Sequence, residues 1–528
     1  TQKFFLILHE LITFFNQNYN STSMKSLKML AIGLLALAFA AAPITQTYAQ
    51  EKRVVNEKFI TKYKKGKDGI IRTDVPKRPA GQQNALQMTA PALKTVRVGF
   101  VGLGMRGPGA VERFTHMKDM GLSVEIKALC DYEKGRAEGC QKFLQKAGMP
   151  DATIYYGEDG YKQLCEREDI DLVYIAVDWD HHVPVALYAM EHGKHAAVEV
   201  PTAMNLKDCW DLVNMSEKTR KHCIQLENCC YDFFEMNTLN MAQQGLFGEI
   251  VHVEGAYIHC LDDFWPYYWK GPKDTNGKDK DPLGWRMRYN RDYRGDVYAT
   301  HGLGPACQLL NIHRGDRLKT LIAMDTDPFH GPEYIKSKTG EDVKDYQCGD
   351  HTTTLMKTEK GKVIEIQHNV MNPQPYSRLY QLTGMKGFAN KYPEVAGAQY
   401  ALGGDALASG DGVPNHENLN AHGWLTAEQQ KALENRYMHP LIKEVGEKAK
   451  TVGGHGGMDF IMDYRLVYCL QHGLPLDMDV YDLAEWCCVA ELGYISMKEN
   501  AAVEVPDFTR GYWNVESKLK MHGVPGKE

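Results

Sequence analysis

A short apolar strand that runs into a glycine-rich turn constrains this chain more than any other feature. Residues Val96 to Val101 are apolar and rich in β-branched side chains, which predicts a buried parallel strand, and Gly-x-Gly-x-x-Gly follows at Gly102, Gly104 and Gly107. In such a turn the first glycine permits a tight bend, the second lets a pyrophosphate approach the backbone, and the third lets the next helix pack closely. The amides at the start of that helix face the anion. The sequence therefore predicts a dinucleotide site.

An acidic residue after the second predicted strand indicates which dinucleotide is bound. Residues 123–130 form an apolar run, and Asp131 follows it, 24 positions after Gly107. A carboxylate at this place accepts hydrogen bonds from ribose hydroxyls and repels a 2′-phosphate, so NAD is favoured over NADP. Lys134 and Arg136 weaken that preference because they are cationic.

The order of the predicted elements indicates two kinds of sheet. Strand and helix signals alternate as far as about residue 229, as a doubly wound parallel sheet requires. Further along, the alternating run 251–258 is typical of half-buried antiparallel strands, and more such runs lie at 318–325, 352–358, 363–369 and 379–386. We expect an α/β protein, with an NAD-binding Rossmann domain at 95–229 and an α+β domain carrying an open, largely antiparallel sheet at 230–502.

Several segments between and after these strands also carry predictions. The polar, aromatic stretch 261–292 is expected to be a lid loop. We expect an irregular segment at 387–430, helices at 458–472 and 483–498, and a C-terminal tail at 503–528.

The first 94 residues predict export rather than a folded domain. A basic start at Met24 to Lys28, the apolar run 29–42 and the small-residue site Thr47 to Ala49 are typical of a Sec-type signal peptide. We expect residues 1–23 to be upstream translated sequence, a mature start near Gln50, and an arm at 50–94. The apolar run is too short for a stable membrane span, so the protein is expected to be periplasmic or secreted.

Charge and cysteine content limit the partners. A net charge of −6 provides no basic field for nucleic acid. The 13 cysteines are scattered without zinc-ligand spacing, so neither a metal site nor a disulfide framework is predicted, and most are expected to be buried.

Four motifs together resemble the Gfo/Idh/MocA-type oxidoreductases over roughly residues 96–498: the glycine turn, Asp131, the strand leading to Glu199-Val200-Pro201, and Gly248-Glu249-Ile250. Dehydrogenases of that superfamily have a catalytic lysine at the position of Val200, whose side chain can neither donate nor accept a proton. Four further blocks resemble the branch known as glycoside hydrolase family 109, the NAD-dependent α-N-acetylgalactosaminidases. They are Trp285-Arg286, residues 295–302 around Tyr298 and His301, residues 372–377 and residues 454–459.

This resemblance implies roles for individual residues. Contact with NAD is implied for residues in the glycine turn and after the first strands, and for Asn228. The residues are Gly102, Gly104, Met105, Arg106, Gly107, Asp131, Trp179, His182, Glu199, Val200 and Asn228. Substrate contact is implied for Tyr257, Arg286, Tyr298 and Tyr376, and a place close to the chemistry for His301.

Tyr298 and His301 are the leading acid/base pair. They are three residues apart at a predicted helix start, so both can face one pocket. Histidine titrates near neutrality, whereas tyrosine needs a cationic neighbour such as Arg286 to lower its pKa. The alternative is that both residues cap and pack the helix 300–312. Tyr231 is a reserve candidate.

Several other side chains keep two interpretations. Glu199 is expected to position the cofactor rather than to transfer a proton. His455 either reaches the site or only opens the helix that follows it, and the second is expected. Tyr257 and Tyr376 either stack on a sugar face or only pack against neighbouring strands.

Three functions remain open. The first is a glycosidase that releases terminal α-linked N-acetylgalactosamine by oxidation at C3, elimination, addition of water and reduction, with NAD regenerated in each turnover; NAD-dependent glycosidases are known exceptions to the two-carboxylate scheme. The second is an NAD(P)-dependent sugar dehydrogenase, and the third a non-catalytic sugar-binding protein. In each case the partner is a carbohydrate, and we expect a homo-oligomer.

Overall fold

Residues 60–273, 275–394 and 398–521 are described by the computed structural model, so the predicted signal peptide at 1–49 lies outside the described residues. The predicted dinucleotide-binding part is a sheet of six parallel strands in the order β5-β4-β3-β6-β7-β8. Its strands are β3 (Val96–Val101), β4 (Val124–Asp131), β5 (Thr153–Tyr156), β6 (Leu172–Ile175), β7 (His195–Val198) and β8 (Cys223–Gln225). This doubly wound order confirms the predicted Rossmann sheet.

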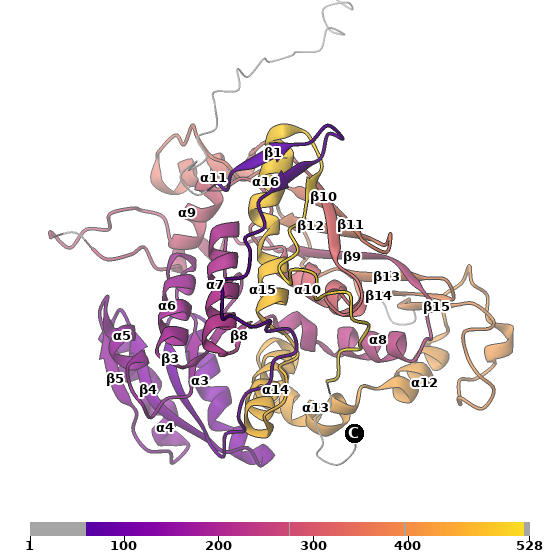
Figure 1. Ribbon diagram of the computed structural model, residues 1–528, viewed down its shortest axis with the longest axis horizontal. Coiled ribbons are helices and arrows are strands. Elements are labelled where there is room, and N and C mark those ends of the chain that lie inside the picture. Colours follow the sequence, from indigo (N-terminus) through magenta and orange to yellow (C-terminus); the bar gives the residue numbers. More distant parts are fainter. Residues whose placement is uncertain (1–59, 274, 395–397, 522–528) are drawn as a thin grey trace, which may run out of the picture. The chain divides into compact units, whose positions relative to one another are not determined.

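Helices connect and cover these strands (Figure 1). They are α3 (Gly107–Thr115), η2 (Met117–Met120), α4 (Lys134–Lys146), α5 (Gly160–Cys165), α6 (Trp179–Glu191) and α7 (Leu206–Thr219). Local sequence sets several of their starts. Pro108 lies in the first turn of α3, where its missing amide hydrogen costs nothing. The Asn205 side chain accepts a hydrogen bond from the Asp208 amide and caps α7.

The second sheet has ten strands in the order β1-β2-β16-β10-β11-β12-β9-β13-β14-β15. Most neighbours are antiparallel, but β9 pairs with β12, and β2 with β16, in parallel. Its central strands are β9 (Ile250–Ile258), β10 (Leu318–Asp325), β11 (Thr352–Thr358), β12 (Val363–Asn369) and β13 (Tyr380–Gly384). The prediction of a largely antiparallel sheet is confirmed.

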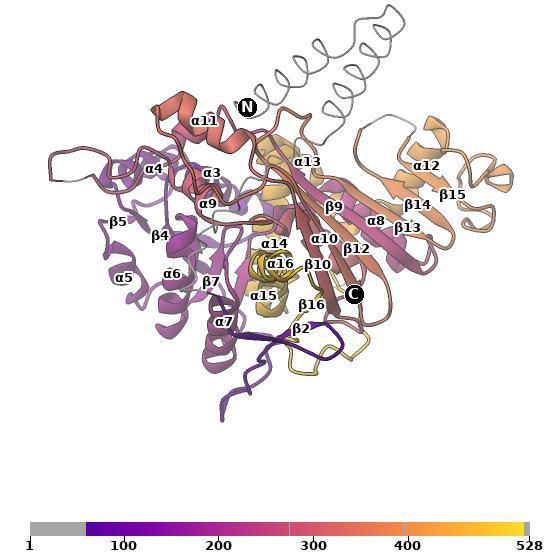
Figure 2. The same cartoon turned by 90° about the horizontal axis from the view of Figure 1, so that it is seen from above.

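One face of this sheet is buried and the other is open. Helices α10 (Thr300–Leu309) and α16 (Val489–Glu499) pack on the buried face, against β9 and β10 respectively. The sheet is seen from a second direction in Figure 2. On the opposite face Ile322, Met324 and Leu355 are exposed. The alternation of buried and exposed residues along β10 and β11 matches a sheet with one covered face.

The remaining helices are α8 (Phe233–Gln243), α9 (Trp285–Asp292), α11 (His330–Thr339), α12 (Ala427–Tyr437), α13 (Pro440–Val452), α14 (Met458–His472) and α15 (Val480–Cys487), with short 3-10 turns η3 (Asn228–Tyr231), η4 (Trp265–Tyr267), η5 (His416–Asn418) and η6 (His455–Gly457). Helix α15 packs on α7 and α14 on α3, so C-terminal helices brace the Rossmann domain. An Asp479 capping box starts α15.

Three secondary-structure expectations need correction. The end of the predicted lid loop is helical, because residues 285–292 form α9. The segment 387–430 is not wholly irregular, since it contains β14 (Gly387–Asn390), β15 (Tyr400–Leu402) and the start of α12. The helix expected at 483–498 is two helices, α15 and α16, which meet at Cys488.

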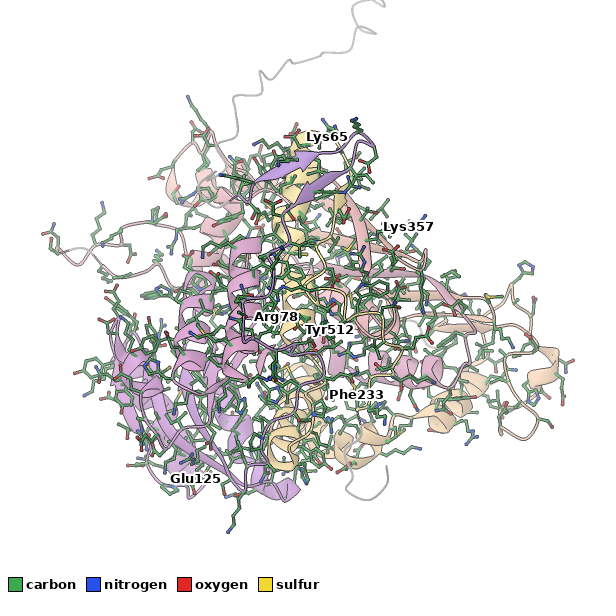
Figure 3. All side chains as sticks on the ribbon, viewed as in Figure 1. Lys65, Arg78, Glu125, Phe233, Lys357 and Tyr512 are labelled. Atoms are coloured by element: carbon green, nitrogen blue, oxygen red, sulfur yellow. The ribbon has the colours of Figure 1, made fainter. Side chains whose placement is uncertain are left out.

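Both ends of the described chain add to the second sheet. Residues assigned to the arm form β1 (Tyr63–Lys65) and β2 (Ile71–Thr73), and residues 503–504 of the predicted tail form β16 (Val503–Glu504). Arm and tail also meet at Arg78 and Tyr512, where the guanidinium lies 5.1 Å from the ring centroid (Figure 3).

Two further sequence expectations concern burial and membranes. Twelve of the 13 cysteines are buried, and Cys260 is partly exposed. Within the described ranges, no helix combines the length and apolar character that a membrane crossing requires.

Candidate functional site

A cavity of about 700 Å³ opens at the carboxyl ends of the parallel strands, where ligands bind in such sheets. Most of the predicted cofactor residues line it: Gly102, Gly104, Met105, Arg106, Asp131, Trp179, His182, Glu199 and Val200. Gly107 starts α3 directly behind this wall, and Asn228 is buried away from it.

The three glycines of the turn meet different surroundings. A Cβ on Gly102 would lie 2.4 Å from the Ala176 carbonyl carbon, and one on Gly107 would lie 2.0 Å from the Gly102 oxygen. Gly102 also has a φ of 92°, which favours glycine. A Cβ on Gly104 would meet only one nitrogen of Arg136, at 3.5 Å. The backbone at Gly104 is therefore open to a ligand, as close approach of a pyrophosphate requires.

Asp131 is positioned by the turn that it serves. Its two carboxylate oxygens accept hydrogen bonds from the backbone amides of Leu103 (2.7 Å) and Glu133 (2.8 Å). A carboxylate oxygen accepts more than one hydrogen bond, so capacity remains for ribose hydroxyls. Arg136, one of the two cations expected to weaken the preference for NAD, lies 3.7 Å from Asp131.

The predicted lid lies over the cavity. Residues of both its loop and α9 line the opening: Tyr267, Tyr268, Trp269, Gly271, Pro272, Lys280, Trp285, Arg286 and Arg288. The Trp269 ring lies 5.2 Å from that of Tyr132, which directly follows Asp131. The Tyr289 hydroxyl donates to Asp180 at the start of α6. The lid therefore contacts the Rossmann domain at two places, Tyr132 and Asp180.

Trp179 and His182 occupy different environments although both line the cavity. Trp179 packs against Trp285, Tyr289 and Tyr298, with ring centroids 4.9 to 5.8 Å away. The two His182 ring nitrogens lie 2.8 and 3.1 Å from the carbonyl oxygens of Pro201 and Val177. Burial lowers the pKa of His182. This histidine holds together the ends of two strands.

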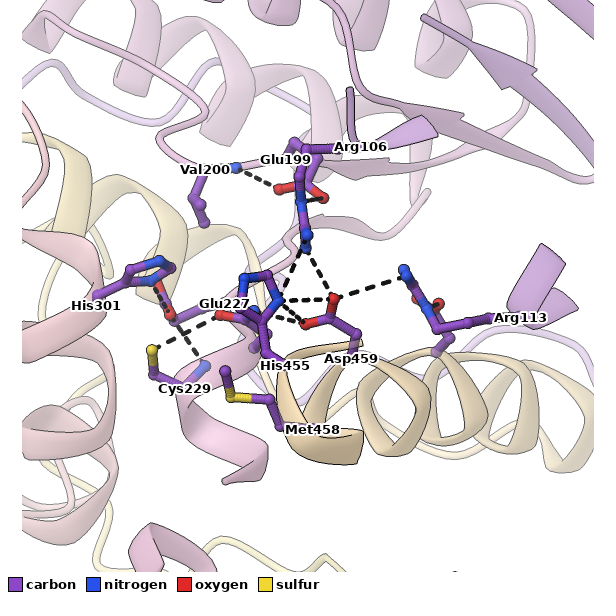
Figure 4. Close-up of polar contacts among 12 residues, drawn as sticks. Arg106, Arg113, Glu199, Val200, Glu227, Cys229, His301, His455, Met458 and Asp459 are labelled. Carbon is purple, nitrogen blue, oxygen red and sulfur yellow. Dashed lines mark hydrogen bonds and ion pairs between the residues drawn. The ribbon is translucent and has the colours of Figure 1, made fainter. Parts of the chain in front are cut away.

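Arg106 joins the glycine turn to the C-terminal part of the chain (Figure 4). It lies 3.4 Å from Glu199 and 2.9 Å from Asp459. His455 is 3.4 Å from Arg106 and 3.0 Å from Asp459. The sequence had suggested that His455 only opens the next helix, but it also joins this group of side chains. The Asn228 amide donates to Asp459 at 2.6 Å.

Asp459, the centre of this group, was not singled out from the sequence. Burial alone would raise its pKa, but the hydrogen bond with His455 and the charges of Arg106 and Arg113 outweigh burial and hold the pKa well below its usual range. Asp459 is therefore ionised and fixes the side chains of Arg106 and Asn228.

A buried histidine–carboxylate pair lies next to the predicted substrate residues. His301 at the start of α10 donates from Nδ1 to Glu227, 2.6 Å away, and Glu227 also accepts from the Cys229 amide. A carboxylate only accepts, so Nδ1 carries the proton and Nε2 retains its lone pair. Burial lowers the pKa of His301 although Glu227 opposes this. The resulting neutral imidazole is suited to accept a proton.

Tyr298 shares this place, as the sequence predicted. Its ring centroid lies 4.9 Å from His301 and 4.5 Å from Tyr257. The Arg286 guanidinium lies 4.6 Å from the Tyr298 ring centroid, and Nη2 donates to the Tyr257 hydroxyl at 3.4 Å. Tyr298 and Arg286 line the cavity. Burial raises the Tyr298 pKa well above 10 despite Arg286, so the expectation of a lowered pKa fails in this state and the phenol keeps its proton.

The other tyrosines lie farther out or elsewhere. Tyr376 is 40% exposed, and its ring contacts His259 at 4.9 Å rather than the cavity wall. Tyr231 donates its hydroxyl to Asp477, a buried partner of Arg465, which removes it from the acid/base candidates.

Glu227, Cys229 and His301 each offer one metal-ligand atom, all within 4.8 Å of one another. The Nη1 group of Arg378, however, lies 3.4 Å from the Cys229 sulfur. A guanidinium beside the cluster disfavours a second cation there.

Two family profiles together match most of the chain. The profile described as "Oxidoreductase family, NAD-binding Rossmann fold" matches residues 96–226, and the one described as "Glycosyl hydrolase 109, C-terminal domain" matches residues 231–515. The second alone spans more than half of the sequence. The chain belongs to glycosyl hydrolase family 109. It is accordingly a glycoside hydrolase, and the cofactor of its Rossmann domain is NAD.

Curated relatives agree with this family 109 assignment. "Glycosyl hydrolase family 109 protein 4" of Phocaeicola vulgatus is 63% identical over 454 residues, 86% of each chain. "Glycosyl hydrolase family 109 protein 1" of Bacteroides thetaiotaomicron is 61% identical over 452 residues, 85% of this chain and 92% of the relative.

Solved structures share the fold at low identity. An NAD-binding oxidoreductase from Klebsiella pneumoniae is 15% identical, with a TM-score of 0.57 over 78% of this chain and 99% of the other. A levoglucosan dehydrogenase in complex with NADH and L-sorbose is 16% identical, with a TM-score of 0.56 over 79% of this chain and 100% of the other. These two structures share the fold of this family 109 chain over 78% and 79% of its length.

Proposed function

We propose that this family 109 protein hydrolyses terminal α-linked N-acetylgalactosamine by oxidation, elimination, addition of water and reduction. The observation that carries the proposal is the neutral His301, which is held by Glu227 and packs against Tyr298, while Tyr298 and Arg286 line a cavity whose glycine turn fits NAD. A proton acceptor and a proton donor thus lie beside the cavity that most of the predicted cofactor residues line.

NAD, when bound, supplies reversible hydride removal from C3 of the sugar, which acidifies the C2 proton and lets the glycosidic oxygen leave from C1. The residues of the chain, and water in the exposed cavity, must move the protons. The proton of the C3 hydroxyl, which is released with the hydride, passes to water and returns when the ketone is reduced. We assign the C2 proton to Nε2 of His301, because Nδ1 is held by Glu227. Tyr298 retains its proton and is assigned to protonate the departing glycosidic oxygen. The high basicity of that oxygen matches a phenol of raised pKa.

Arg286 orients this pair without needing to titrate. Its guanidinium lies over the Tyr298 ring and donates to the hydroxyls of Tyr257 and Tyr268. Because arginine stays charged, it also stabilises negative charge that develops on a sugar oxygen. Val200, at the place of the dehydrogenase lysine, lines the cavity but offers no proton.

Incubation of the purified protein with 4-nitrophenyl α-N-acetylgalactosaminide, without added NAD, tests the proposal. Release of nitrophenol without net NADH supports it. Stoichiometric NADH would instead indicate the sugar dehydrogenase, and sugar binding with neither product the non-catalytic protein. A sugar deuterated at C2 should lose its label to water during turnover, whereas full retention would reject elimination.

Export and self-association are also part of the proposal. We propose that the protein is exported by its Sec-type signal peptide, which N-terminal sequencing of the mature protein would test. We also propose that the open face bearing Ile322, Met324 and Leu355 pairs with a second copy. A monomer in analytical ultracentrifugation would contradict that pairing.

A further inference from the structure

Arg378 is a buried guanidinium with unused donors. The residue is 8% exposed. Its Nη1 group contacts the sulfur atoms of Cys229 and Met458, each at 3.4 Å. Its Nε is buried and, among the described residues, has no hydrogen-bond partner. Leaving a buried donor of a charged group unpaired is costly, so this position calls for an acceptor from elsewhere.

Other arginines of this protein show which group the Nε–Nη2 edge of a guanidinium normally binds. Arg97, Arg294 and Arg465 each use Nε together with Nη2 to bind a carboxylate, at distances of 2.6 to 2.8 Å. No ion pair joins Arg378 to a carboxylate in the part of the chain that the structure describes, so its Nε–Nη2 edge lacks the carboxylate partner that the other three arginines have.

The sheet register places this fork beside the catalytic histidine. Ser377 pairs with Ile258 in an antiparallel bridge, so Arg378 lies opposite Tyr257 on the same face of the sheet. The Tyr257 ring centroid is 5.3 Å from that of His301. From the other side, Cys229 contacts Arg378 through its sulfur and Glu227 through its amide.

The charges around Arg378 favour a neutral acceptor over an anion. Asp232 interacts electrostatically with Arg378, and Lys391 lies 2.9 Å from both Asp232 and Glu235. Two carboxylates and two cations give no formal excess charge. An amide carbonyl oxygen supplies the missing acceptor without adding a negative charge.

We propose that Arg378 determines specificity by donating from its Nε–Nη2 edge to the carbonyl oxygen of the substrate's 2-acetamido group. The Cys229 thiol and the Met458 thioether then pack against the acetyl methyl group. This inference rests on the proposed function: the acetamido nitrogen is bonded to C2, the carbon whose proton we assign to His301. One carbon thus presents its proton to the histidine and its substituent to the neighbouring arginine.

The test compares kcat/KM for 4-nitrophenyl α-N-acetylgalactosaminide and α-galactoside in the wild type, R378M and R378K. R378M removes every donor, and R378K keeps the charge but loses the fork. Both should lower the ratio of the two values, R378M by on the order of 10- to 100-fold, as expected for loss of a hydrogen bond from a charged donor. Arg317→Met is the matched control, since Arg317 pairs with Glu359 at the end of β10 and should leave the ratio unchanged.

Titration calorimetry with free N-acetylgalactosamine and galactose separates this inference from the proposed function. If the wild type prefers N-acetylgalactosamine, R378M loses the preference and no glycoside is cleaved, the inference stands and the proposed function fails. If the wild type cleaves the glycoside but both substrates lose rate equally in R378M and R378K, the inference fails alone. A wild type that neither binds nor cleaves either sugar refutes both.

Discussion

Replacing Glu227 by glutamine tests the acid/base assignment most directly. The substitution keeps the shape of the side chain but removes the charge that lies 2.6 Å from Nδ1 of His301. Unit charges about 4 Å apart interact by about 4 kcal/mol at an effective dielectric constant of 20, which gives the order of magnitude of the attraction that appears once His301 is protonated. A charge-assisted hydrogen bond typically contributes about 1.5–3 kcal/mol, so kcat/KM should fall roughly 10- to 150-fold.

The pH profile of this variant has a defined direction. Burial lowers the pKa of His301, and Glu227 opposes that effect. Without Glu227 the pKa falls further. A base works only while unprotonated, so its acidic limb lies below the ordinary histidine pKa of about 6.5. In E227Q that limb should move to lower pH while the plateau of kcat/KM drops.

Measurement of kcat/KM from pH 4 to 9 in both proteins decides the matter. Glu217→Gln is the matched control, because Glu217 is equally buried but pairs with Arg78 and Arg510. An acidic limb that stays in place or moves upward, with an unchanged plateau, would refute the role of the pair.

Four other substitutions test the cofactor site, the lid and the stability of the fold. A Cβ on Gly107 would lie 2.0 Å from a carbonyl oxygen, so G107A should lower the Tm by overpacking worth about 1–3 kcal/mol. A Cβ on Gly104 meets no backbone atom, so G104A should mainly lower the NAD content of the purified protein. Trp269→Ala removes an aromatic contact worth about 0.5–1.5 kcal/mol between lid and Rossmann domain, and NAD release followed by fluorescence of the reduced cofactor should quicken up to about tenfold. Burial raises the pKa of Asp296 to about 7, and an acid whose pKa is raised in the folded state destabilises the fold as pH rises from about 4 to 7. D296N should therefore raise the Tm more at pH 8 than at pH 4, and a larger increase at pH 4 would contradict this.

Local sequence was enough to predict the features set by neighbouring residues. The strand, glycine turn and acid of the cofactor site depend on short spacings, and so does the meeting of Tyr298 with His301. Glu227 was missed because its partner lies 74 positions away. Its only sequence signal is a carboxylate after a buried strand, and such residues are common.

The missed structural details have a similar origin. The segment 285–292 is polar and lacks apolar periodicity, and α9 depends on tertiary packing of Trp285 and Met287. The residue between α15 and α16 is Cys488 rather than a glycine or a proline, so nothing in the sequence marks the break between the two helices. The three-residue strands β1 and β2 exist only because they extend the edge of a sheet built much later in the chain.

The two halves of the proton-accepting pair come from different domains, Glu227 from the end of the Rossmann sheet and His301 from a helix on the other sheet. A chain whose domains have formed but not docked would hold an imidazole without its carboxylate. It would therefore be unable to start chemistry on a sugar. Enzymatic competence thus reports completed assembly, because a nascent or partly unfolded copy lacks the contact that makes the docked chain active.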